Sequence, residues 1–399
     1  MIMKYILSIF ITILLFACNQ SPKMENEINL SMLNSDNLLQ LSSLYDSISY
    51  VKLETTSECL IGNIKKIIPF ANQYFIFDEE YSNIFIFDTK GKFIKKIGEK
   101  GTGPNEYVKI DDICFDQIKK RLFVLDNTRN MIQVYDNSGL VLYNITLPFK
   151  TSEIEYLSGN RILCYNDFKA NNELNKDGEY PLITLIDADN GKELSSYTYF
   201  SHKIQSQEVT LPFSATSTNG TSVSVFNTLT STISVFHENG EIKEYMLNFG
   251  TEDTQTREKY ISKLHEKQLN ANDICSDCKH QPDYTIITSV FKEKEYFYIS
   301  AVNFIEKKQY FIRYNLNTSN CIYAKSGTIN PFINDIDNGK ILLIPNSIEN
   351  GRVYGCINAL SLCYHAENND SINSESLKHI IKHTKEEDNP IIFIAKLKL

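Results

Sequence analysis

The chain repeats itself at a fixed spacing. Tyr74–Ile97 (YFIFDEEYSNIFIFDTKGKFIKKI) matches Arg121–Ile145 (RLFVLDNTRNMIQVYDNSGLVLYNI) at an offset of 48 residues, without a gap. A third copy, Thr221–Met246, has Asn227 and His237 in place of two aspartates. The aligned positions are Asp78 with Asp126, Asp88 with Asp136, Gly91 with Gly139, and Ile97 with Ile145. A repeat of this length predicts copies of one supersecondary unit.

Each unit predicts four short strands. Two runs of β-branched and aromatic residues flank a short polar connection, and a turn that ends in glycine leads to a third run. Asp or Asn at a strand end can bond the turning backbone, and Gly supplies positive φ. A further apolar run precedes each copy, as in Ile64–Pro69 and Ile113–Phe115. Four-stranded units of 40 to 50 residues are typical of β-propellers.

Less similar copies of the same four-strand unit occupy the rest of the chain. They cover Ile154–Tyr199 and Ile286–Ser326, and Ile329–Pro345 begins a last unit. The strands predicted at Ile48–Leu53 and Ile391–Leu399 have no partner in their own stretches, and pairing them would close a ring without free edges. We therefore predict an all-β, six-bladed propeller at residues 46–399, with four antiparallel strands per blade and seven blades as the alternative.

Two polar insertions interrupt the predicted ring. Thr251–Asp283 contains a predicted helix at Gln255–Leu269, and residues 349–389 contain one at about Ser374–Thr384, where Ser374-Glu375 is a helix start signal.

The first residues indicate export. Lys4 precedes an apolar run, Tyr5–Phe16, which is too short to span a membrane comfortably, and Leu15-Phe16-Ala17-Cys18 ends it. This predicts a signal peptide at residues 1–17, a lipid on Cys18 and a flexible tether at 18–45. A cleaved signal with an incidental cysteine and an uncleaved anchor are the alternatives. The net charge of −9, without a basic stripe, argues against nucleic acid as a partner.

Several motifs together resemble one family. They are the lipobox, FIFD…FDTKGKFIKKIG, KGTGPNEY at Lys100–Tyr107 and the ending EEDNPIIFIAKLK. The chain resembles the six-bladed β-propeller lipoproteins of Gram-negative bacteria, distant relatives of NHL-repeat and TolB-like propellers. The resemblance implies the fold and a place on the outer membrane. The absence of an acidic run after Cys18 favours its periplasmic face.

One loop is a candidate ligand site. Gly101–Tyr107 joins the first two predicted blades, and its functional interpretation is a loop at the mouth of the ring, where Glu106, Tyr107, Asp111 and Asp112 meet a ligand. The alternative, which the sequence favours, is a tight turn in which Glu106 caps backbone amides.

Cys275 and Cys278 form the most specific candidate for a chemical site in the sequence. Their spacing suits a local disulfide, half of a zinc site completed by His280 and His265, or two free thiols, and the disulfide is favoured over the metal. His379 and His383 share one helix face, but no glutamate between them could serve as a metalloprotease base.

The sequence shows no catalytic set. No G-x-S-x-G motif occurs, and the 49 acidic residues neither support nor exclude a glycosidase. We expect no cofactor and no metal. The leading hypothesis is an envelope-anchored binding or scaffold module for a protein or glycan. The alternative is a carbohydrate-active hydrolase or lyase that uses carboxylates at the channel mouth.

Overall fold

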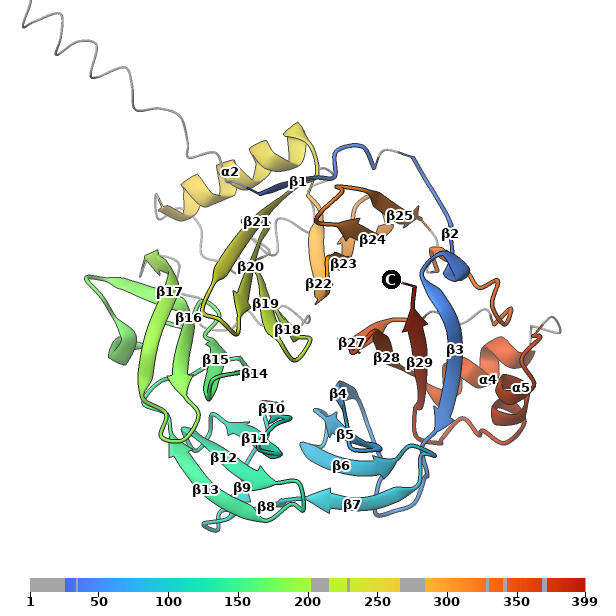
Figure 1. Ribbon diagram of the computed structural model, residues 1–399, viewed down its shortest axis with the longest axis horizontal. Helices are drawn as coiled ribbons and strands as arrows, with labels where there is room; N and C mark the ends of the chain where they lie inside the picture. The colour runs from blue at the N-terminus through green and yellow to red at the C-terminus, as the bar shows by residue number, and fades with distance from the viewer. Residues whose placement is uncertain are drawn as a thin grey trace, which may run out of the picture.

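The computed structural model describes residues 26–33, 35–201, 215–227, 230–265, 284–327, 330–339, 343–367 and 372–398. These residues form six blades around a central axis (Figure 1), each with four antiparallel strands. The predicted six-bladed propeller is confirmed.

Blades 1 to 5 are each continuous in sequence. Blade 1 contains β4 (Ile64–Phe70), β5 (Gln73–Asp78), β6 (Asn83–Asp88) and β7 (Phe93–Ile97). Blade 2 contains β10 (Asp112–Asp116), β11 (Arg121–Asp126), β12 (Met131–Asp136) and β13 (Val141–Thr146). Blade 3 contains β14 (Glu153–Leu157), β15 (Arg161–Tyr165), β16 (Glu179–Asp187) and β17 (Glu193–Ser201). Blade 4 contains β18 (Thr216–Thr218), β19 (Ser222–Asn227), β20 (Thr232–His237) and β21 (Ile242–Asn248). Blade 5 contains β22 (Ile286–Glu293), β23 (Tyr296–Asn303), β24 (Lys308–Asn315) and β25 (Cys321–Ser326).

Blade 6 joins the two ends of the chain. It consists of β27 (Pro345–Glu349), β28 (Arg352–Ile357), β29 (Ile391–Leu397) and β3 (Tyr45–Lys52), in that order. β3 pairs antiparallel with β29, and Tyr50 lies opposite Phe393. The predicted closure of the ring by an N-terminal strand is confirmed.

The strands are apolar on both faces because every blade lies between two others. Successive side chains of a strand point to opposite faces. In β5, Phe75 and Phe77 pack against blade 2, whereas Tyr74 and Ile76 pack against blade 6. This explains why strands inside a blade, such as β5 (QYFIFD) and β11 (RLFVLD), are unbroken apolar runs rather than apolar–polar alternations.

The repeated aspartates serve the turns, as predicted. Asp88 Oδ1 accepts hydrogen bonds from the backbone nitrogens of Lys90 and Lys92, at 2.8 and 2.9 Å. Asp136 Oδ1 accepts from Ser138 and Leu140 in the same way. Gly91 has φ +83°, and a Cβ there would lie 2.0 Å from a backbone oxygen of Lys52.

The segment predicted as a flexible tether contains strands at Glu27–Asn29 and Leu39–Gln40. β1 (Glu27–Asn29) adds in parallel to the outer edge of blade 4, and β2 (Leu39–Gln40) pairs with β26 (Phe332–Ile333). A short 3₁₀ helix, η1 (Leu41–Ser43), follows. The tether prediction fails here because Ile28, Leu30 and Leu33 are buried against blades 4 and 5, although the segment around them is polar.

The helices lie between strands near the outside of the ring. α2 (Thr251–His265) follows blade 4 and begins four residues before the predicted start. α4 (Ala359–Glu367), which was not predicted, and α5 (Glu375–Lys382) lie between β28 and β29, and Ser374 caps α5. The second insertion therefore begins after β28, and its predicted start at residue 349 was too early, because Pro345–Glu349 and Arg352–Ile357 are strands.

Two short pieces complete the described fold. β8 (Glu99–Lys100) pairs in parallel with β9 (Glu106–Tyr107) between blades 1 and 2, and the 3₁₀ helix η2 (Asn172–Leu174) lies between β15 and β16.

Because β29 closes the propeller, we expect truncation of one of its buried aromatic side chains to lower the stability of the protein strongly. Phe393 is fully buried on β29, so Phe393→Ala should lower the free energy of unfolding by about 3–5 kcal/mol in urea titrations. Ile94→Ala on the exposed outer strand β7 is the control and should change it by less than about 1 kcal/mol. Equal effects of the two substitutions would contradict the closing role of β29.

Candidate functional site

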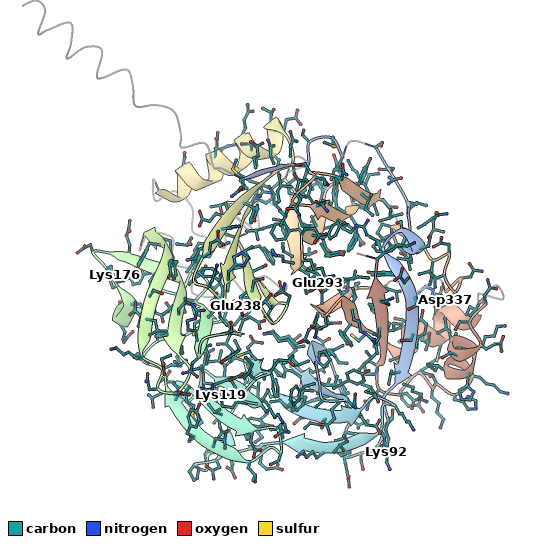
Figure 2. The ribbon with its side chains drawn as sticks, in the orientation of Figure 1. Lys92, Lys119, Lys176, Glu238, Glu293 and Asp337 are labelled. Carbon is teal, nitrogen blue, oxygen red and sulfur yellow. The ribbon has the colours of Figure 1, made fainter. Side chains whose placement is uncertain are left out.

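A cavity of about 1120 Å³ follows the propeller axis. Its wall takes residues from β4, β10, β14, β18, β22 and β27, the first strand of each blade (Figure 1). Hydroxyl and amide side chains share this wall with apolar ones. Among the polar groups are Ser152, Ser217, Ser289, Asn346 and Ser347, and among the apolar ones are Phe115, Phe291 and Phe311. Figure 2 shows the side chains around this axis.

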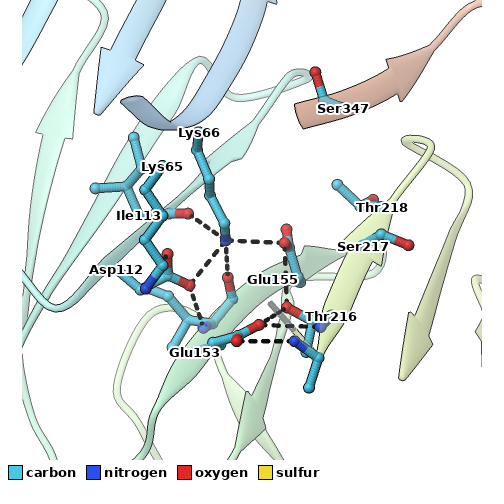
Figure 3. Close-up of polar contacts among 12 residues, drawn as sticks. Lys65, Lys66, Asp112, Ile113, Glu153, Glu155, Thr216, Ser217, Thr218 and Ser347 are labelled. Atoms are coloured by element: carbon cyan, nitrogen blue, oxygen red, sulfur yellow. Dashed lines mark hydrogen bonds and ion pairs between the residues drawn. The ribbon is translucent and has the colours of Figure 1, made fainter. Parts of the chain in front are cut away.

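Lys66 is the centre of a buried ion cluster at the cavity wall (Figure 3). Its ammonium lies 2.8 Å from Asp112 Oδ2 and 2.9 Å from Glu155 Oε1. It also donates to the carbonyl oxygens of Ile113 and Ile154, at 3.0 and 3.3 Å. One side chain of blade 1 thus contacts both blade 2 and blade 3.

A β-bulge explains how two consecutive lysines face the same neighbours. The register of β4 against β5 shifts between Ile64 and Lys66. Bulges re-aim side chains and are common beside functional sites. Lys65 Nζ therefore donates to the backbone oxygen of Asp111 at 2.9 Å and lies 3.8 Å from Asp112 Oδ1. That oxygen of Asp112 has no hydrogen-bond partner in the described part of the chain.

Glu153 extends the cluster to blade 4. Its two carboxylate oxygens accept hydrogen bonds from the backbone nitrogens of Ala215 and Thr216, at 2.9 and 3.0 Å. The Thr216 hydroxyl donates to the same carboxylate at 2.6 Å. This carboxylate fixes the start of β18, so its role is structural.

Glu155 differs from the other carboxylates of the cluster. Its Oε1 contacts Lys66 and, at 3.4 Å, the Thr216 hydroxyl. Its second oxygen, Oε2, has no hydrogen-bond partner among the described residues. Glu155 also lines the cavity, although its side chain is buried.

Burial and charge set the protonation of this cluster. Burial is the largest cause that raises the pKa of Glu155, to about 7; Lys66 opposes the rise, and Asp112 and Glu153 add to it. Burial disfavours the Lys66 ammonium, but the carboxylates of Asp112, Glu155 and Glu153 together raise its pKa above the ordinary value. Lys66 therefore stays charged, and Glu155 is the group that takes up a proton near neutral pH.

A second carboxyl with a raised pKa lines the same cavity. Burial, with the nearby Glu293 carboxylate, raises the pKa of Glu349 to about 7. Gln117 Nε2 donates to Glu349, and Glu293 accepts from the Gly351 nitrogen at 2.8 Å. Glu293 and Glu349 are the last residues of the inner strands β22 and β27, and Gln117 follows the inner strand β10.

The structure brings together only two of the four residues in the predicted ligand site. Asp111 lines the cavity, and Asp112 is buried in the ion cluster. Glu106 instead turns back to accept from the Gly103 nitrogen at 2.7 Å, and Tyr107 is buried between blades 1 and 2. Arg129 donates to the carbonyl oxygens of Gly103 and Glu106 and holds this loop away from the channel.

Other predicted residues lie elsewhere. His379 is exposed on α5 and His383, also exposed, caps its C-terminal end; His383 Nδ1 lies 2.7 Å from the backbone oxygen of His379. Cys18, Cys275, Cys278 and His280 are outside the described residues, as is the side chain of His265. Within the described ranges, no group of three or more His, Cys, Asp or Glu side chains is placed to hold a metal ion. No helix in these ranges is long and apolar enough to cross a membrane.

Sequence reasoning missed Lys66, Glu153 and Glu155. Two signals were present: consecutive lysines inside an apolar strand (IKKIIPF), and two glutamates with strand spacing at the start of another (EIEYL). A charge inside an apolar strand indicates a buried partner.

The raised pKa of Glu155 predicts how stability depends on pH. Between its ordinary value of 4.5 and about 7 the folded state binds more protons than the unfolded state, so the free energy of unfolding should fall as pH rises through this window, by about 3 kcal/mol. Glu155→Gln cannot titrate, so its unfolding free energy should fall less steeply, with the remaining slope due to the other carboxyls whose pKa is raised, Glu349, Glu293 and Asp167.

Urea titrations at pH 5, 6, 7 and 8 check this expectation. Glu58→Gln, the same change at an exposed turn, should follow the parent protein. Parallel curves for Glu155→Gln and the parent would show that Glu155 does not take up the proton.

Known structures share this architecture. A "Putative exported protein" from Bacteroides fragilis aligns with a TM-score of 0.73 at 20% identity, over 94% of this chain and 100% of that chain. A member of the DUF4221 family from Bacteroides vulgatus aligns with a TM-score of 0.54 at 12% identity, over 91% of this chain and 99% of that one. At these identities the likeness shows the fold. A search of curated proteins finds no match.

A family model gives the assignment. It is described as a domain of unknown function, DUF4934, and it matches residues 25–396, which include all six blades and the β1 strand at the rim. The chain belongs to the DUF4934 family of propeller domains of unknown function.

Proposed function

We propose that this propeller is an exported binding module that takes a small, hydroxyl-rich ligand such as a glycan into its central channel. The cavity of about 1120 Å³ is of the size that holds small ligands. Its hydroxyl and amide groups offer donors and acceptors, and its phenylalanine rings offer apolar faces to a sugar.

The engagement of the carboxylates supports binding over catalysis. Asp112 contacts Lys66 and the Ile154 nitrogen, at 2.8 Å each, and Glu153 is occupied by the start of blade 4. A glycosidase needs two carboxyl groups that face the substrate. In the ion cluster only Glu155 combines a position on the cavity wall with an oxygen that has no described partner, and Glu349, the second cavity-lining carboxyl described above, accepts a hydrogen bond from Gln117.

A hydrolase or lyase is the second candidate, because of this same carboxyl. A buried glutamic acid with a pKa near 7 is suited to general acid catalysis. Turnover of a glycan by the parent protein that is lost in Glu155→Gln would favour the enzyme.

The binding proposal predicts that blocking the channel abolishes ligand binding. Ser289 lines the cavity, so Ser289→Phe should fill part of it and weaken binding at least tenfold in a calorimetric screen of neutral, acidic and amine-bearing oligosaccharides. Ser57→Phe, at an exposed turn, is the control and should leave affinities unchanged. Binding that survives Ser289→Phe would place the ligand outside the channel.

We also propose that Cys18 carries the lipid that anchors the propeller to the outer membrane, on its periplasmic face. The lipobox, the resemblance to NHL-like and TolB-like lipoprotein propellers, and the likeness to a protein named as exported support this.

Fractionation tests the anchor. Cys18→Ala should move the chain from washed membranes to the soluble fraction, whereas Cys321→Ala should leave it in the membranes. Retention of Cys18→Ala in washed membranes would refute lipidation at this residue.

A further inference from the structure

The apolar side chains of the channel wall are gathered on one side of it. Among the described residues of the wall, every aliphatic and phenylalanine side chain comes from blades 5, 6, 1 and 2 or from the segment that joins blades 5 and 6. These four blades are consecutive in the closed ring (Figure 1). The described residues that blades 3 and 4 give to the wall are polar, apart from Tyr156 and Gly220. The channel therefore has an apolar side and a polar side.

The apolar side reaches one open end of the channel. Ile344 directly precedes β27, and Phe304 directly follows β23. Because β23 runs antiparallel to β22, both residues lie at the mouth where the first strands of blades 5 and 6 begin. Both line the cavity, and they are 58% and 42% exposed. A ligand that covers these side chains removes apolar surface from water, which favours binding.

The apolar surface continues from this mouth along the wall of blades 5 and 6. Phe332 and Phe311, whose ring centres are 5.1 Å apart, line the cavity, as do Leu343 and Phe291. All four side chains belong to one apolar cluster or pack against it. A hydrocarbon group that enters at this mouth thus has apolar neighbours along one side of the channel.

A hydroxyl group faces this mouth from the opposite side. In a ring of six, blade 3 stands opposite blade 6 (Figure 1). Ser152 directly precedes β14, the first strand of blade 3, and lines the cavity together with Lys169. Lys169 Nζ donates to Ser152 Oγ, and no described residue accepts the proton of this hydroxyl. The Ser152 hydroxyl can therefore donate to a ligand.

We propose that the ligand of the channel is a sugar with an apolar substituent, which lies on the wall of blades 5 and 6 while the sugar hydroxyls face blades 3 and 4. The inference rests on the proposed channel-binding function and names the chemistry of its ligand. In pockets that are mainly apolar, a few placed polar groups fix the orientation of the ligand. A hydrocarbon chain, as in a glycolipid, and an aromatic ring, as in an aryl glycoside, share this chemistry.

Two series of glycosides test the proposal by calorimetry. The methyl, butyl and hexyl β-glycosides of glucose and of galactose differ only in chain length, and the phenyl glycosides carry a ring instead. Burial of one methylene group strengthens binding by up to about fourfold. We therefore expect the affinity to rise at least about tenfold from the methyl to the hexyl or the phenyl glycoside in one sugar series.

The same measurements identify the substituent and the need for the sugar. A rise with the hexyl glycoside alone assigns a hydrocarbon chain, and a rise with the phenyl glycoside alone assigns an aromatic ring. Hexan-1-ol has the chain without the sugar hydroxyls, so it should bind at least about tenfold more weakly than the hexyl glycoside. Equal binding of the two would show that the polar side of the channel takes no part.

A matched pair of variants locates the substituent. Ile344→Asn places an amide at the apolar mouth and should cut the ratio of substituted to methyl glycoside affinity at least about threefold. Leu360→Asn, the same change on α4 outside the cavity wall, should leave this ratio unchanged. Ile344 and Leu360 are 58% and 53% exposed, so both variants should fold. Phe304→Asn, at the same mouth, should act as Ile344→Asn does.

Two further results would overturn the inference. Equal affinity for the methyl, hexyl and phenyl glycosides, with oligosaccharide binding that Ser289→Phe still abolishes, would do so and leave the binding function intact. A rise in affinity that both Ile344→Asn and Phe304→Asn preserve would place the substituent away from this wall. Failure of every glycoside and every oligosaccharide to bind would refute the proposed function itself, and the inference with it.

Discussion

The pairing of β3 with β29 is the interaction on which the rest of the structure depends. It makes one blade from the two ends of the chain and leaves no gap in the ring. Every blade then has two neighbours, so strands that are apolar on both faces can be buried completely. The axial cavity exists for the same reason, since its wall takes one strand from each of the six blades.

Much of this fold could be predicted from the sequence because turn chemistry repeats along it. Asp88 and Asp136 bond the same turning amides, and Gly91 and Gly139 have similar positive φ values. The N-terminal rim strand was missed because three apolar residues, Ile28, Leu30 and Leu33, stand in a polar segment without a strand-like run. Their burial depends on blades 4 and 5, more than 200 residues away in the chain.

The candidate site was harder to predict than the fold. Of the predicted residues, Asp111 and Asp112 lie at the channel, because a strand that follows an inter-blade loop begins beside the axis. Lys66 and Glu155 come from different blades, and only the closed ring brings them to 2.9 Å. Buried ion pairs add little net stability but are costly to leave incomplete, so we expect the cluster to contribute little to the stability of the ring as long as it is intact.

The strap formed by residues 26–33 and 35–44, which lies along the outside of the ring, has a mechanical consequence. A pull on the chain ahead of residue 26 first meets the parallel pairing of β1 with β21, then the contacts of Asn37 with Lys325 and of Leu39 with Phe332. Only after these have given way does the tension reach β3. Tension applied at this end is thus borne first by contacts with blade 4, blade 5 and β26, and the β3–β29 pairing that closes the ring is loaded last.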